Sequence, residues 1–334
     1  MLLLPLGVEN FEKIRGFQEG KKTEPEHIYA DKTGLLYNLL NTKSPYFLSR
    51  PCRFGKSLLI DTLDNILRGR RELFEGLQIY KSNYDWKPYP VIRLSLAAID
   101  TESVRTLKSD LIAELQAIAD RENLTLRGST PPAVFKSLFE KLYSKYDREV
   151  AVLIDEYDAP ILSKLHQPKL ADKIRECLRI FYLVLKDKAS QRGFTFITGV
   201  TKFAQASIFS SLNNLVDITL DEQYASICGF TEDEFNSLFP EYMEVMLERL
   251  KARSNKPPEY TLTNLYDAIK DWYDGYTWDG QTKVFNPWSI LCAFQKNRFG
   301  DYWSKTGGIP SFLVNLVKTG LVDFKAFRAK ESIT

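Results

Sequence analysis

The stretch RPCRFGKS, residues 50–57, decides how the rest of the chain is interpreted. Its last three residues, Gly55, Lys56 and Ser57, end the phosphate-loop pattern G-x-x-x-x-G-K-[ST], but Arg50 stands where that pattern has its first glycine. A GKS tripeptide also occurs by chance in surface turns. The flanking residues separate the two interpretations, because a phosphate loop connects a strand to a helix.

The loop stands between a predicted strand and a predicted helix. Residues 46–50, YFLSR, form an apolar run typical of a buried strand. After Ser57, apolar residues recur at helical spacing until Gly69 ends the pattern. In such a loop the N–H groups of a helix N-terminus face a nucleotide's phosphates. The sequence therefore predicts that Lys56 binds the β- and γ-phosphates, that Ser57 binds Mg²⁺ and that Gly55 lets the backbone approach closely.

A second, acidic motif is expected to complete the site. Residues 150–154, VAVLI, form a continuous apolar run typical of a parallel strand buried on both faces, and Asp155 and Glu156 follow it. Asp155 would hold the metal ion directly or through water, and Glu156 is the residue type that activates an attacking water. A solvated acidic turn is the alternative. The GKS loop upstream favours the functional interpretation.

Further strands are predicted at 91–96, 194–200 and 215–220, with a helix from roughly 170–186. The strand at 91–96 lies between the two motifs in the chain. An inserted strand and a glutamate after the metal-binding aspartate are typical of the additional-strand catalytic-glutamate branch of P-loop ATPases. Thr198 fits the polar position that senses the γ-phosphate there, although threonine is also a good strand former. The predicted fold class is α/β: a P-loop NTPase parallel sheet of this type with a second, mainly helical domain.

The region after residue 222 has the pattern of helices. Thr231 followed by Glu234 forms a capping box at a helix start. A later helix is expected to end near 274–275. Five aromatic residues of this region could form a small core or a partner surface: Trp272, Tyr273, Tyr276, Trp278 and Trp288. We expect residues 1–222 to form the P-loop domain and residues 223–334 to form a helical lid or adaptor domain.

Composition excludes several classes of protein. The 334 residues are 44% hydrophobic and 26% charged, which allows a full core and an ordinary water-exposed surface. A formal net charge of +2 gives no electrostatic argument for a nucleic-acid or membrane partner. Four cysteines without a CxxC pair and two histidines argue against a zinc site. With no signal-peptide pattern and no run of about 18 apolar residues, we expect a cytoplasmic chain with reduced thiols.

Further ordered segments can be read along nearly the whole chain. They are YADKT at 29–33, RPCRFGKS at 50–57, LFEGLQIY at 73–80, VLIDEYDAPI at 152–161, FITGVTKFAQASIFSSLNNL at 196–215, GFTEDEF at 229–235, WYDGY at 272–276, FNPWSI at 285–290 and YWSKTGGIPSFL at 302–313. Together they resemble the bacterial AAA-ATPase-like family, whose members commonly carry a restriction-endonuclease-like domain at the C-terminus. This chain stops at KESIT without it, so we expect either a fragment or a protein without that activity.

The resemblance implies a complete nucleotide-binding loop in altered form. The residues concerned are Arg50, Arg53, Phe54, Gly55, Lys56, Ser57 and Leu58. Family members carry arginine in place of the first glycine, in a loop like RPRRFGKS. Arg50 and Arg53 could contact phosphate oxygens with paired N–H groups, but Arg50 could equally pair with an acidic neighbour and lock the loop. Cys52 stands where arginine is usual, so one phosphate donor is lost.

The sequence thus predicts an ATP-binding protein that uses Mg²⁺ and hydrolyses ATP slowly in a conformational switch. Glu156 and Thr198 are the predicted catalytic residues, and Ser57 and Asp155 the predicted metal ligands. The second interpretation is a nucleotide-regulated protein-binding module with little or no turnover. The third, a scaffold that has lost ATP binding, is opposed by the retained site residues. A protein partner or effector domain is expected at the helical region, and a homo-oligomer is compatible with the sequence.

Overall fold

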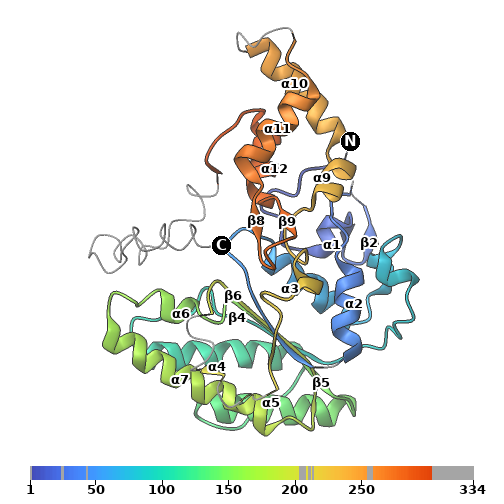
Figure 1. Cartoon of the computed structure of the whole chain (residues 1–334). Coiled ribbons are helices and arrows are strands. Elements are labelled where there is room, and N and C mark those ends of the chain that lie inside the picture. Colours follow the sequence, from blue (N-terminus) through green and yellow to red (C-terminus); the bar gives the residue numbers. More distant parts are fainter. Residues whose placement is uncertain are drawn as a thin grey trace.

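The centre of the molecule is a parallel sheet of five strands, seen in a computed structural model that describes residues 2–23, 26–42, 44–202, 208–209, 212, 214–253 and 259–302 (Figure 1). The strands are β3 (Pro45–Ser49), β4 (Val91–Ser95), β5 (Val150–Asp155), β6 (Arg192–Gly199) and β7 (Val216–Asp217). Their order across the sheet is β4-β5-β6-β3-β7, and every neighbouring pair is parallel. β3 and β5 are buried along their whole length, as their continuous apolar runs predict.

The strand order brings the two motifs together. β3 leads into the GKS loop and β5 leads into Asp155 and Glu156, and only β6 lies between them. β4, which lies between the motifs in the chain, is instead at the edge of the sheet beside β5. Because the strands are parallel, their carboxyl ends meet at one end of the sheet, where α/β proteins bind ligands.

The last strand is shorter than predicted. The sequence indicated a strand over 215–220, whereas β7 contains two residues. The chain turns after Asp217, whose side chain accepts a hydrogen bond from the Thr219 N–H at 2.9 Å. An aspartate that binds the backbone two residues later favours a turn over a continued strand.

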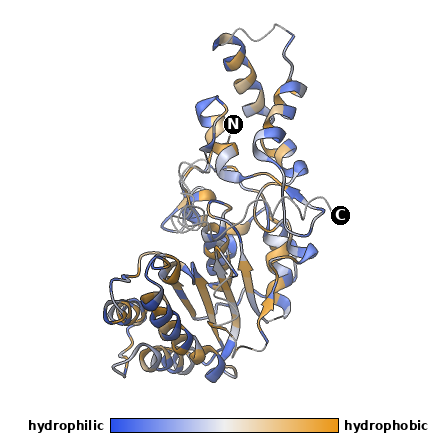
Figure 2. Ribbon diagram, turned by 60° about the vertical axis from the view of Figure 1, so that its left-hand side comes forward, coloured by the Kyte–Doolittle hydropathy of each residue, from blue (hydrophilic) through white to orange (hydrophobic). Residues whose placement is uncertain are grey.

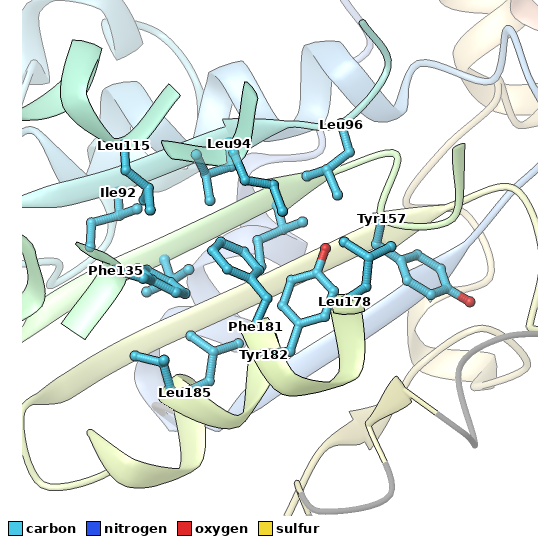
Figure 3. Packing of buried hydrophobic residues seen from close by; sticks show 14 of the residues in the cluster. Ile92, Leu94, Leu96, Leu115, Phe135, Tyr157, Leu178, Phe181, Tyr182 and Leu185 are labelled. Carbon is cyan, nitrogen blue, oxygen red and sulfur yellow. The ribbon is translucent and has the colours of Figure 1, made fainter. Parts of the chain in front are cut away.

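Helices on one face of the sheet form the largest hydrophobic cluster. They are α4 (Val104–Arg121), α5 (Pro131–Tyr146), α6 (Ala159–Leu162) and α7 (Pro168–Asp187). Figure 3 shows Phe135 of α5 and Phe181 of α7 packed beneath Ile92 and Leu94 of β4. The Phe135 and Phe181 rings are stacked, with centroids 4.8 Å apart. The helix predicted at roughly 170–186 is confirmed as α7.

The other face is covered by α2 (Thr33–Thr42) and α3 (Lys56–Leu67), with the 3₁₀ turns η1 (Arg71–Phe74) and η2 (Gln78–Lys81) beside them. The N-terminal elements are α1 (Phe11–Ile14), β1 (Phe17–Gln18) and β2 (Lys21–Lys22). α3 begins at Lys56, and Gly69 follows its end with a φ of 73°. The strand–loop–helix prediction around GKS is therefore confirmed.

The C-terminal region forms a group of helices that extends away from the sheet (Figures 1 and 2). After η3 (Glu222–Tyr224) come α9 (Glu232–Leu238), α10 (Pro240–Arg253), α11 (Leu262–Tyr273), β8 (Tyr276–Thr277), β9 (Lys283–Val284) and α12 (Pro287–Lys296). The predicted capping box is present, because Thr231 and Glu234 exchange hydrogen bonds at the start of α9. The hairpin of β8 and β9 was not predicted from the sequence.

Hydrophobic clusters cross between the two regions. The helical cluster includes Ile28 and Ala30 from the N-terminal segment, and the α2–α3 cluster includes Val284 from the hairpin. The five aromatic residues of the C-terminal region differ in burial: Tyr273 is 2% exposed, whereas Trp272 is 53% exposed. Neither a single core nor a single partner surface describes all five residues. None of the described helices has the length and apolar character needed to cross a lipid bilayer.

Candidate functional site

The loop between β3 and α3 uses left-handed backbone at two positions. The φ of Arg53 is 68° and that of Gly55 is 91°. A Cβ atom at Gly55 would meet no heavy atom within 4 Å, so backbone conformation rather than space favours glycine there. Gly55 is also the N-cap of α3 and has no side chain to cap it. The first N–H groups of α3 consequently lack a side-chain cap and can bind an anion.

A cavity of about 420 Å³ lies at this helix N-terminus. Its loop residues are Cys52, Arg53, Phe54, Gly55, Lys56, Ser57 and Leu58. Lys56 is only 5% exposed, and its ammonium donates a hydrogen bond to the Pro51 carbonyl at 3.1 Å. The loop backbone therefore holds this cation at the wall of the cavity.

Glu156 brings the second motif to the same cavity. Its φ of 51° is left-handed, which is uncommon for a residue other than glycine and is a strain found at functional sites. Burial raises the pKa of Glu156 and the Asp155 carboxylate raises it further, whereas the Lys56 ammonium lowers it. The Lys56 ammonium, predicted from the other motif, is thus close enough to influence the pKa of this carboxyl.

Asp155 and Thr198 form a buried pair beside Glu156. The Thr198 hydroxyl donates to Asp155 Oδ1 at 2.6 Å, and the Glu156 N–H donates to the same oxygen at 3.0 Å. The pair follows from the sheet, because β5 and β6 are neighbours and Ile154 is paired with Ile197. The two predicted residues therefore lie together, although neither is among the described residues that line the cavity.

Asp158, which the sequence analysis did not select, ties the second motif to the end of β6. Its buried carboxylate accepts hydrogen bonds from the N–H groups of Val200 and Thr201, and from the Thr201 hydroxyl at 2.9 Å. Burial raises the pKa of Asp158, although these hydrogen bonds oppose the shift. Tyr157 adds a hydrogen bond from its hydroxyl to the Thr201 carbonyl at 2.8 Å. Tyr157 and Asp158 thereby hold Val200 and Thr201, the two residues that directly follow β6.

The Arg50 side chain holds the start of the loop against neighbouring segments of the chain. Its side chain is completely buried and donates to the carbonyls of Ser49, Thr219 and Tyr224 at 2.9, 2.7 and 3.2 Å. Its guanidinium carbon also lies 4.5 Å from the ring centroid of Trp278. Burial lowers the pKa of Arg50. Its hydrogen bonds and ring contact are those of a residue that locks the loop, and the Asp217 carboxylate acts on it through its charge.

Arg53 and Phe54 line the cavity and also contact aromatic rings of the C-terminal region. The Arg53 guanidinium carbon lies 4.6 Å from the ring centroid of Trp288. Phe54 makes edge contacts with Tyr276 and Trp278, with ring centroids 4.9 and 5.6 Å apart. The loop is therefore in contact with both the hairpin and α12.

Oxygen atoms of the two motifs could serve as ligands of a magnesium ion. The Ser57 hydroxyl and the Asp155 carboxylate are hard oxygen ligands of the kind that Mg²⁺ prefers. Within the described part of the chain, no group of three or more His, Cys, Asp or Glu residues is placed to hold a metal. Mg²⁺ at nucleotide sites is commonly held by one or two protein groups together with phosphates and water, so the residues present fit it.

Residues outside the two motifs line the rest of the cavity. They include Glu9, Ile28, Ala30, Lys32, Cys228, Phe230, Trp288 and Leu291. Lys32 is 8% exposed, and its ammonium lies 2.6 Å from both carboxylate oxygens of Glu234. Burial lowers the pKa of Lys32, and Glu234 opposes the shift. Ala30, Lys32, Phe230 and Trp288 fall within the segments 29–33, 229–235 and 285–290, which were quoted from the sequence without being assigned to the site.

Arg175, Arg179 and Arg192, in or just after the helix that follows the second motif, are the sequence candidates for an arginine that stabilises charge on a transferring phosphate. Arg175 and Arg179 of α7 pair with acidic residues three positions earlier on the same helix. Arg192 begins β6 and donates to the Leu185 carbonyl at 2.8 Å. None of these three lies among the described residues that line the cavity.

Comparison with known proteins agrees with this arrangement. The family described as "Predicted AAA-ATPase" matches residues 5–209, a range that contains both motifs. A protein of Azotobacter chroococcum mcd 1, described as "Uncharacterized protein in vnfD 5'region", is 38% identical over 316 residues, which are 94% of this chain and 56% of that protein. The chain thus spans little more than half the length of this relative. Because the family match covers more than half of the chain, the protein belongs to the AAA-ATPase-like family.

Proposed function

We propose that this protein binds ATP with Mg²⁺ in the cavity at the start of α3 and hydrolyses it slowly. Membership in the family suggests ATP binding. The observation that carries the proposal is the shared cavity of Lys56, Ser57 and Glu156 at an uncapped helix N-terminus. A volume of about 420 Å³ is in the range of small-molecule sites.

Each residue has a role set by its chemistry. Lys56 and the first N–H groups of α3 bind the phosphates, and Ser57 and Asp155 hold the metal ion. Mg²⁺, when bound, offsets the negative charge of the phosphates. Glu156 accepts a proton from the attacking water, with its raised pKa bringing it nearer to the working pH. Thr198 orients the Asp155 carboxylate by donating to Oδ1.

The strand order and the position of Glu156 after Asp155 support the additional-strand catalytic-glutamate type of P-loop ATPase. In this sheet β6 separates the strand before the GKS loop from the strand before Asp155 and Glu156. We further propose residues 1–222 as the P-loop domain and 223–334 as a helical domain that closes over the nucleotide. Ile28 and Phe230 are apolar residues of the cavity lining and would contact the base.

A nucleotide-regulated binding module with little turnover is the second candidate. It is favoured by the positions of Arg175, Arg179 and Arg192, which leave no arginine from α7 or β6 in the described lining of the cavity. Without an arginine at the transferring phosphate, hydrolysis in phosphate-loop proteins is slow. Both candidates require ATP binding, and they differ in turnover.

The test of binding is calorimetric titration of ATP·Mg²⁺ into the wild type and Lys56→Ala. Charge-assisted contacts contribute about 1.5–3 kcal/mol each, so affinity should fall by roughly tenfold to a hundredfold or more. Lys136→Ala is the matched control, because Lys136 forms an exposed ion pair with Asp187 on the opposite face of the sheet. Equal ATP affinity of Lys56→Ala and the wild type would refute the assignment.

A further inference from the structure

Three residues of the phosphate loop contact three aromatic residues far along the chain. We call Tyr276, Trp278 and Trp288 the aromatic bracket. Arg50 lies over Trp278 and Arg53 over Trp288, while the Phe54 ring contacts Tyr276 and Trp278. The bracket belongs to the hairpin and to the start of α12, which lie on the α3 side of the sheet (Figure 1).

We propose that Arg50 is a positioning residue that couples the phosphate loop to the aromatic bracket. The conformation of the loop and the packing of the helical region then change together. The proposal adds to the proposed function a route by which a nucleotide in the loop acts on the helical region. Its functional consequence rests on the loop binding nucleotide, whereas the coupling itself can be tested without any nucleotide.

Arg50 contacts two separate segments that follow the sheet in the chain. Thr219 and Tyr224, whose carbonyls accept its hydrogen bonds, belong to the segment that leads out of the sheet toward α9. Trp278 belongs to the hairpin by which the chain returns from α11. The Ser49 carbonyl ties the same guanidinium to the end of β3. One side chain thus contacts the loop strand, the outgoing segment and the returning hairpin.

The chemistry of arginine explains why this position differs from the glycine of a standard loop. A planar guanidinium can donate to carbonyls in several directions while its face lies on an aromatic ring. Its charge is buried among backbone carbonyls and the Trp278 ring. Nη1 and Nη2 donate to the carbonyls, whereas Nε has no hydrogen-bond partner among the described residues. Burial of a charge is costly unless it is compensated, so the carbonyl and ring contacts are needed to keep this guanidinium in place. Lysine has a compact ammonium and cannot reproduce this arrangement, and glycine would leave the loop without any of these contacts.

Trp278 allows the coupling to be tested from outside the cavity. It contacts Arg50 and Phe54 but is not among the described residues that line the cavity. Trp278→Leu therefore leaves the cavity lining itself unchanged while it removes the ring that Arg50 and Phe54 contact. The matched control is Trp86→Leu, because Trp86 contacts Phe74 and Tyr84 in the same cluster, away from the loop.

The first measurement is ATP·Mg²⁺ affinity by calorimetric titration, with thermal unfolding of each variant alongside. We expect affinity to fall about tenfold in Arg50→Lys and about threefold to tenfold in Trp278→Leu. Trp86→Leu and Arg192→Lys should bind as the wild type does, since the Arg192 guanidinium donates to a carbonyl at the opposite end of β6. Wild-type affinity in folded Arg50→Lys and Trp278→Leu, with only a lower melting temperature, would overturn the proposal.

The second measurement is amide hydrogen exchange of residues 50–57 without nucleotide. Exchange there should be severalfold faster in Trp278→Leu than in the wild type and Trp86→Leu. This result supports the coupling even if the wild type binds no ATP, in which case the proposed function alone fails. Equal exchange in Trp278→Leu and Trp86→Leu means that the bracket does not position the loop. If Arg50→Lys does not fold, both measurements can still be made on Trp278→Leu.

Discussion

Glu156 and Thr198 act on the same few atoms of the site, so single substitutions can separate their roles. Glu156 reaches the cavity with its carboxyl, whereas Thr198 is completely buried and donates only to Asp155 among its recorded contacts. The first residue should affect the proton transfer. The second should affect the position of the metal-binding carboxylate.

Replacing Glu156 with glutamine should preserve ATP binding and reduce turnover. Glutamine has the same shape but cannot accept a proton, and general base catalysis contributes roughly 10²–10⁴-fold to a rate. The measurement is phosphate release at saturating ATP. Glu9→Gln is the control, because Glu9 is the other carboxylate in the cavity lining. Wild-type turnover in Glu156→Gln would remove Glu156 from the chemistry, and a wild type without measurable turnover would favour the binding module.

Replacing Thr198 with valine should weaken the metal-dependent step. Valine keeps the volume and removes the hydrogen bond to Asp155, a contact to a charged group worth about 1.5–3 kcal/mol, so turnover should fall roughly tenfold to a hundredfold. Thr195→Val is a control on the same strand, because the buried Thr195 hydroxyl has no hydrogen-bond partner among the described residues. A rise in the Mg²⁺ concentration needed for half-maximal turnover in Thr198→Val alone is the specific signature. Equal profiles for the two variants would argue against the positioning role.

For single residues, the sequence predicts positions that a nearby loop or strand end determines. It misses contacts between residues that are far apart in the chain. Lys56, Ser57 and Glu156 were found because a loop or a strand end determines where they lie. The position of Arg50 depends on the carbonyls of Thr219 and Tyr224, and backbone carbonyls leave no signal in a sequence. Sequence reasoning could therefore name a locking role for Arg50 but not its partners.

Glu234, at the start of α9, takes part in two interactions. Glu234 accepts a hydrogen bond from the Thr231 N–H at 2.9 Å as part of the capping box, and it also pairs with Lys32 in the cavity wall. The side chains of Lys32 and Glu234 are 9% and 24% exposed. The helix is thereby attached to the N-terminal segment through a largely buried ion pair.

Glu234→Gln should destabilise the protein much more than Glu232→Gln. Glutamine retains the capping hydrogen bond but leaves Lys32 buried without its counter-charge, and breaking a buried pair costs about 3–5 kcal/mol. Because Glu234 is partly exposed, we expect the lower end, about 3 kcal/mol. Glu232 pairs with Lys270 on the exposed side of the same helix, so its loss should cost about 0–1 kcal/mol. Urea unfolding of both variants measures the difference, and equal midpoints would show that the Lys32 pair contributes little.

Elements with a long repeating pattern were predicted well, and short ones were not. α3 and α7 carry several turns of apolar periodicity, and the α9 capping box is a local signal. The strands of the hairpin contain two residues each, which is too short for alternation to be recognised. The length of β7 was overestimated for a related reason, because the turn after Asp217 follows from a side-chain hydrogen bond within an otherwise strand-like sequence.

The arrangement of the whole molecule depends on contacts between distant segments, which the sequence pattern does not reveal. The parallel sheet was predicted, but the position of β6 between β3 and β5 follows from packing of helices on both faces. Likewise, the division at residue 222 is a prediction from the sequence, and hydrophobic clusters contain residues from both sides of it. Ile28 packs with the helical region, and Val284 packs with α2 and α3. A change at the cavity beside α3 can therefore reach the helical region through packed side chains.

ATP should protect the helical region from hydrogen exchange more than ADP does. A ligand shifts a conformational equilibrium only by its difference in affinity for the two states, and a full reversal from 1:99 to 99:1 requires about 5.5 kcal/mol. The γ-phosphate is the only difference between the two nucleotides, and the loop that would bind it contacts Trp278 and Trp288. With a non-hydrolysable ATP analogue, exchange in residues 225–253 and 259–302 should be slower than with ADP. Helix α5, on the opposite face of the sheet, is the internal reference and should exchange equally in both states. Equal protection of the helical region by both nucleotides would make it a passive support, and a switch driven by the γ-phosphate would then be wrong.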